Sequence, residues 1–64
     1  MLLTVDALVR DEGTVIVAIG TSEDGRRLHF AGDHRAMQGI ASALAAGEVV
    51  EVEVEGWQIL GESS

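Results

Sequence analysis

The stretch Gly47–Leu60, GEVVEVEVEGWQIL, decides how the rest of the chain is interpreted. Apolar and acidic residues alternate in its first half, which is the period-two pattern of a strand with one buried and one solvated face. We therefore predict a strand over Glu48–Glu55, with its valines inward and its glutamates in water. Unbroken alternation would place Trp57 and Ile59 among the glutamates, so we expect a bulge or bend at Gly56 that turns both toward the core.

A helix is predicted just before that strand, over Asp33–Ala46. Asp33 is suited to the N-cap position because its carboxylate can accept the free amides of the first turn and complement the helix dipole. Gly47 suits the left-handed position that follows a last helical turn. The apolar residues recur at helical spacing and form a narrow stripe, namely Met37, Ile40, Ala41 and Leu44.

Three strands are predicted before the helix, over Met1–Arg10, Thr14–Gly20 and Arg26–Ala31. The first alternates along its whole length, and we expect Asp11-Glu12-Gly13 to form a three-residue hairpin loop after it. The third has Leu28 and Phe30 on its inward face. The inward face expected for the first strand carries Met1, Leu3, Val5, Ala7 and Val9.

The second strand differs because both of its faces are apolar. One face carries Val15, Val17 and Ile19, and the other carries Ile16 and Ala18. Strands of this kind lie in the middle of a sheet and are covered on both sides. A single helix can cover only one side, so the sequence predicts that something else covers the other.

These elements predict an α+β fold with the order β-β-β-α-β. The sheet is expected to be small, mixed and mostly antiparallel, with the helix packed on one face. If Trp57–Leu60 formed a separate strand, the alternative would be a five-stranded OB-like barrel with the helix between its third and fourth strands. The length of 64 residues predicts one domain, spanning residues 1–64.

Composition points to self-association. A chain of this size buries a limited share of its surface, and small domains commonly rely on disulfides, metals or oligomerisation. The sequence has no Cys, no Tyr, one Trp and one Phe. We therefore expect a homo-oligomer, most simply a dimer formed through the apolar sheet face, with a second protein as a further partner to consider.

The net charge of −7 argues against a nucleic-acid partner, because phosphate contacts depend on Lys and Arg. Bases gather in residues 26–35, which hold three arginines and two histidines against one acid. The start of the chain, residues 1–6, has neither a basic region nor a long apolar run. We expect no membrane segment and a cytoplasmic location.

One group of residues suggests a binding site for an anion or another small ligand. His34 and Arg35 follow the predicted N-cap, where a helix start offers free amides and positive potential. Trp57 and Gln58 would close such a pocket if the last segment ran nearby. The opposing interpretation is that Asp33 already uses those amides and would itself repel an anion.

The sequence offers little support for metal or catalytic chemistry. A metal site would recruit His29, His34 and Asp33, but their spacing matches no recognised site, so no metal or cofactor is expected. No serine lies in a nucleophile motif, and no residue is expected to be catalytic. We predict a non-catalytic association module, with the ligand-binding site as the alternative and an OB-like nucleic-acid binder as a weaker one.

Overall fold

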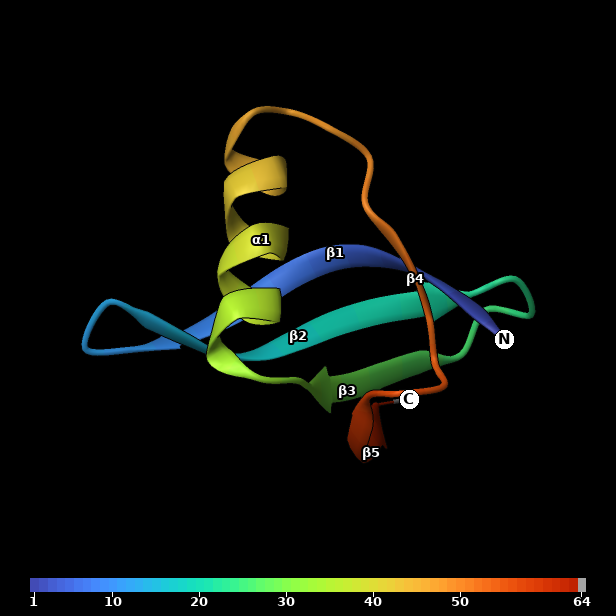
Figure 1. The fold of residues 1–64 in the computed structure, drawn as a ribbon. Helices are drawn as coiled ribbons and strands as arrows, with labels where there is room; N and C mark the ends of the chain where they lie inside the picture. Colours follow the sequence, from blue (N-terminus) through green and yellow to red (C-terminus); the bar gives the residue numbers. More distant parts are fainter. Residues whose placement is uncertain (64) are drawn as a thin grey trace.

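The computed structural model describes residues 1–63, with side chains described to Glu62, and contains five strands and one helix in the order β-β-β-α-β-β. The strands form one open sheet in the order β4-β1-β2-β3-β5, and Figure 1 shows α1 crossing its strands. The elements are β1 (Leu2–Asp11), β2 (Thr14–Ser22), β3 (Arg27–Ala31), α1 (His34–Ala45), β4 (Glu51–Glu53) and β5 (Gln58–Ser63). The predicted α+β fold is confirmed, but every strand pair is antiparallel, so the sheet is not mixed.

A separate fifth strand forms, but the OB-like barrel that was predicted for that case does not. β5 begins at Gln58, directly after the bend at Gly56 and Trp57. It pairs with β3, while β4 pairs with β1 at the opposite edge, and no pairing joins β4 to β5 within residues 1–63. The link from Glu53 to Gln58 can span about 17 Å at most, so the open sheet must curl to bring its two edges this close. Figure 1 shows this segment crossing in front of the strands.

The acidic strand is shorter than predicted. Its ladder with β1 covers Glu51–Glu53 instead of Glu48–Glu55, with one further hydrogen bond at each end. The Val5 N–H donates to the Val50 carbonyl at 2.9 Å, and the Val54 N–H donates to the Met1 carbonyl at 2.9 Å. The alternation itself is as predicted, since the valines at 50, 52 and 54 pack against the core and the glutamates between them are exposed.

A β-bulge in β1 overturns the inward face predicted for that strand. Leu3 and Val5 are buried, as expected. The register then shifts, with Val5 opposite Gly20 and Ala7 opposite Ile19, so Asp6 is an extra residue on β1. Beyond the bulge Leu8 packs against the core, whereas Val9 is 41% exposed. One inserted residue reverses which side chains face inward.

A second bulge, in β2, reassigns the faces of the central strand. Val9 pairs with Val17 and Arg10 pairs with Val15, which leaves Ile16 as the extra residue. Val15 and Ala18 are buried on the helix side, and Ile16 is 45% exposed. The faces are therefore not Val15-Val17-Ile19 and Ile16-Ala18 as predicted, because the bulge separates Val15 from the residues that follow it.

The turn between β1 and β2 contains two residues, not the predicted three. Asp11 pairs with Thr14, and Glu12 and Gly13 have φ values of 50° and 82°. Positive φ at both central positions is the type I′ geometry, which matches the natural twist of a hairpin. Since β3 reaches β2 only from Ala18 onward, the end of this hairpin has no neighbouring strand among the described residues. We call residues 9–17 the hairpin arm, and Figure 1 shows it projecting beyond α1 and β3.

The helix and its caps form as predicted. Asp33 is the N-cap, and its Oδ1 accepts a hydrogen bond from the Ala36 N–H at 2.8 Å. At the other end the Glu48 N–H donates to the Ala43 carbonyl at 3.0 Å, which closes the last turn. The core lies between α1 and the sheet and contains Leu3, Val5, Val15, Ala18, Leu28, Phe30, Met37 and Ile40.

Trp57 packs against this core, and the chain bends at Gly56 just before it, both as predicted. Gly56 has a φ of 87°, a value that glycine adopts readily and that redirects the chain. The Trp57 ring meets Phe30 edge to face, with centroids 5.2 Å apart and planes at 81°. Ile59 departs from the prediction, because it pairs with Phe30 but remains 42% exposed near the edge of the sheet.

Candidate functional site

The face of the sheet that points away from α1, which we call the outer face, has no cover among residues 1–63. Side chains of β2 alternate between the two faces, with Ala18 on the helix side and Val17 and Ile19 on the outer face. The register places Ala7 and His29 beside Ile19. The helix thus covers one side of the central strand, as predicted, but no segment of residues 1–63 supplies the second cover that the sequence predicted.

Apolar side chains gather at one end of the outer face. Val9 and Ile16 are 41% and 45% exposed, and Val17 and Ile19 are partly exposed beside them. The cross-strand pairs Val9–Val17 and Ala7–Ile19 make these side chains neighbours. We call this group of five residues the apolar arm patch: Ala7, Val9, Ile16, Val17 and Ile19.

The opposite end of the outer face is polar and internally paired. The Thr21 hydroxyl donates to Asp6 Oδ2 at 2.7 Å, and Arg27 Nη2 lies 3.5 Å from the same oxygen. Glu51 and Glu53 of β4 lie exposed further along this end. The outer face therefore changes from charged, near the start of β1, to apolar, on the hairpin arm.

Small and large residues on β2 give a signal for these faces that simple alternation missed. Ala18, Gly20 and Ser22 lie on the helix side, where a Cβ on Gly20 would be 3.0 Å from Leu3 Cβ and 3.3 Å from Phe30 Cε1. The branched residues Val17 and Ile19 lie on the outer side. Since the small residues make room for the core, the larger ones are left on the open face.

The predicted ligand-site residues are brought partly together. Trp57 lies against Gly32, where an added Cβ would be only 2.5 Å from Trp57 Cζ3, and Gln58 pairs with Ala31. Both residues thus lie beside the start of α1. His34 and Arg35 are exposed in the first helical turn.

The geometry at this helix start favours capping over anion binding. The Asp33 carboxylate accepts the hydrogen bond of the Ala36 amide that an anion would need, and its negative charge lies at the helix start, where the anion would bind. The indole of Trp57 fills the volume over Gly32. Binding of a ligand by His34, Arg35, Trp57 and Gln58 stays a prediction. The contacts observed here are the Asp33 cap on the helix and the packing of Trp57 over Gly32.

The candidate metal ligands are not assembled. Across residues 1–63, no three His, Cys, Asp or Glu side chains gather closely enough to share a metal ion. His29 lies mid-strand on the outer face opposite Ile19, whereas His34 begins α1. The chain positions these groups on different elements.

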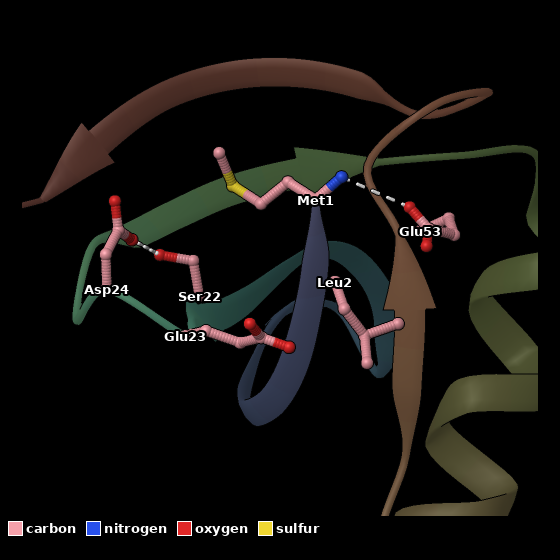
Figure 2. Close-up of a pocket in the computed structure, with 6 residues that line it drawn as sticks. All are labelled: Met1, Leu2, Ser22, Glu23, Asp24 and Glu53. Atoms are coloured by element: carbon pink, nitrogen blue, oxygen red, sulfur yellow. Dashed lines mark hydrogen bonds and ion pairs between the residues drawn. The ribbon is translucent and has the colours of Figure 1, made fainter.

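A pocket of about 460 Å³ lies near the start of β1 and the β2–β3 turn, and Figure 2 shows its lining residues. Glu53 Oε2 lies 3.2 Å from the Met1 ammonium nitrogen, and the Ser22 hydroxyl donates to Asp24. The bond from Ser22 lowers the pKa of Asp24 below its ordinary value. Three carboxylates line the pocket, those of Glu23, Asp24 and Glu53. Two of them, Asp24 and Glu53, already have partners within the chain.

Two arginines of the basic segment that could have contacted nucleic acid are also paired internally. Arg26 donates from Nε and Nη2 to Glu62 Oε1 at 2.9 and 2.6 Å, and this carboxylate raises the pKa of Arg26. Arg27 lies beside Asp6. These contacts reduce the positive potential that phosphates would need.

Neither a check for membrane-spanning helices nor comparison with known proteins adds functional information. Within residues 1–63 the one helix is too short to cross a membrane. Searches with the chain find no matching protein family, no matching curated protein and no matching solved structure.

Proposed function

We propose that this protein is a non-catalytic association module that binds a second copy of itself through the apolar arm patch. The observation that carries the proposal is the exposure of Val9 and Ile16 beside Val17 and Ile19 on an uncovered sheet face. Contiguous apolar surface of this kind commonly marks an interaction site. Complete burial of a Val or Ile side chain contributes about 1.5–3 kcal/mol, and these four begin from partial exposure.

Charge distribution supports a two-fold arrangement in which the hairpin arms overlap. Each copy carries a net charge of −7, so the copies repel at long range. Glu51 and Glu53 lie at the end of the outer face away from the arm. Pairing arm on arm, with the two bodies pointing in opposite directions, covers the apolar patches and keeps these acids apart. A two-fold interface of one patch on itself is the commonest form of homodimer.

The test is the mass of the protein in solution, measured by light scattering and sedimentation over a range of protein and salt concentrations. Wild type is expected to dimerise increasingly with concentration, and salt should favour the dimer by screening the repulsion. Ile16→Glu should shift the protein to monomer because it places a carboxylate in the buried patch.

Val49→Glu is a matched control. It makes the same type of change at a residue that is 80% exposed, in the segment that follows α1 and outside the patch. This variant should dimerise almost as well as wild type. A wild-type monomer at high micromolar concentration would overturn the proposal. A stable dimer that is indifferent to Ile16→Glu would place the interface on another surface.

A further inference from the structure

A second surface, the open backbone edge of β1, adjoins the apolar arm patch, and Ala7 and Val9 belong to both. β4 pairs with this edge only from Leu2 to Thr4, and the bond from Val5 to Val50 ends the contact. From Ala7 to Asp11 no strand pairs with β1 on the side away from β2, within the residues that the structure describes. Backbone N–H and C=O groups at such an edge are available to another strand.

A groove of about 300 Å³ lies between the hairpin arm and α1. The arm contributes Arg10, Gly13 and Val15, and α1 contributes Gln38, Ala41, Ser42 and Ala45. The helix residues are spaced i, i+3, i+4 and i+7, so they form one stripe. Three of them are small, which leaves room for a side chain from another molecule.

Arg10 gives this groove its charge. It is the one charged residue among those that line the groove. The ion pairs and side-chain hydrogen bonds found within residues 1–63 engage Arg26 and Arg27 with carboxylates but do not involve Arg10. An exposed guanidinium beside an open strand edge is complementary to a carboxylate.

We propose that the groove binds an extended peptide segment of a partner protein, added as a strand beside Ala7–Asp11, with a carboxylate that reaches Arg10. Strand addition at an open sheet edge beside a helix obtains affinity from main-chain bonds and selectivity from alternate side chains. Here Arg10 selects an acidic side chain, and the small residues on α1 leave room for it in the groove.

The chain itself shows which chemistry this edge accepts. β4 occupies the first half of the same edge as an antiparallel strand, with Val52 opposite Leu3 and directed to the core. Its neighbours Glu51 and Glu53 are exposed. A segment that alternates apolar and acidic residues can therefore pair with the second half of the edge as well. Because Arg10 faces the helix side, like Val15 opposite it, the register that reaches Arg10 turns the acidic side chains toward the groove and the valines toward the outer face.

The test uses a peptide of sequence VVEVEVE, which copies residues 49–55, acetylated and amidated at its ends. It is titrated into isotope-labelled protein while amide shifts and amide exchange are followed by NMR. We expect the amides of Ala7–Asp11 to shift and to exchange more slowly. Arg10→Gln should weaken binding about two- to five-fold, as for an exposed ion pair, and a VVQVQVQ peptide should bind correspondingly weakly.

Matched variants separate this site from others. Ala45→Gln fills the groove and should reduce binding, whereas Ala46→Gln makes the same change one residue away and should not. Arg35→Gln removes an arginine outside the groove and should have no effect. Repeating the titration with Ile16→Glu keeps this proposal apart from dimerisation through the outer face.

The outcomes are decisive for the site and for its chemistry. No shift of the Ala7–Asp11 amides at millimolar peptide would overturn the proposal, as would shifts confined to Ile16, Val17 and Ile19 of the apolar arm patch. Equal binding of the two peptides, or unchanged binding in both Arg10→Gln and Ala45→Gln, would also overturn it. A version of VVEVEVE with a free C-terminal carboxylate shows whether Arg10 prefers a chain end or a side chain, since the preferred source binds more tightly.

Discussion

Gly32 and Trp57 show how one residue without a side chain can determine the position of another. The Trp57 ring occupies the space in which a Cβ on Gly32 would stand, and an added Cβ would lie 2.5 and 2.7 Å from two ring carbons. The same ring packs edge-on against Phe30. Gly32 therefore allows the link between β3 and α1 to lie under the indole.

We expect Gly32→Ala to destabilise the protein by about 1–3 kcal/mol, the usual cost of overpacking, because Trp57 must move away. Urea unfolding followed by Trp57 fluorescence measures both effects, and the native emission should shift toward that of a more exposed indole. Gly39→Ala is the control, since no atom lies within 4 Å of its added Cβ and α1 should gain up to about 1 kcal/mol. Equal stability of Gly32→Ala and wild type would show that the ring does not depend on this glycine.

At the scale of elements, the hairpin of β1 and β2 combines a tight turn with two bulges. The turn places Glu12 at a φ of 50°, where most L-residues are strained. The bulges at Asp6 and Ile16 then direct Val9 and Ile16 outward. The hairpin is thus the element that converts a two-sided apolar sequence into one buried and one open face.

Replacing Glu12 by Asn should stabilise the hairpin by up to about 1 kcal/mol, because Asn tolerates the left-handed conformation and Asn-Gly is the preferred type I′ pair. Thermal unfolding measures the gain, and amide exchange in Val9–Val17 should slow. Glu23→Asn serves as the control for loss of one exposed acid in the other hairpin turn. If both variants gained equally, the effect would come from charge and not from turn geometry.

At the scale of the whole molecule, the acidic charge and the internal pairing of Arg26 and Arg27 oppose nucleic-acid binding. We expect binding to single-stranded DNA or RNA to be weaker than micromolar at physiological salt, with a shallow salt dependence because few counterions are released. Fluorescence anisotropy with labelled oligonucleotides measures both. Micromolar or tighter binding would contradict this expectation and favour the nucleic-acid hypothesis.

Local patterns in the sequence were sufficient to predict the helix and the first three strands of this fold, whereas a fifth strand was considered only as part of the barrel alternative. The Asp33 cap, the helical stripe with Met37 and Ile40, and the inward Leu28 and Phe30 are all where sequence reasoning placed them. Capping and periodicity depend on residues within one or two turns of each other, so the chain encodes them locally. The alternation of valine and glutamate before Gly56 was equally reliable as a guide to which side of β4 faces the core.

Only the tertiary structure decided the register, the strand neighbours and the open surfaces. A bulge shifts every later residue to the other face, and nothing local marked Asp6 or Ile16 as the inserted residues. The length of β4, the placement of β5 at the far edge and the groove beside Arg10 depend on contacts between distant segments. Sequence reasoning therefore anticipated that the helix covers only one face of the central strand, but the residues that form the other face emerged only when β1, β2 and β3 were paired.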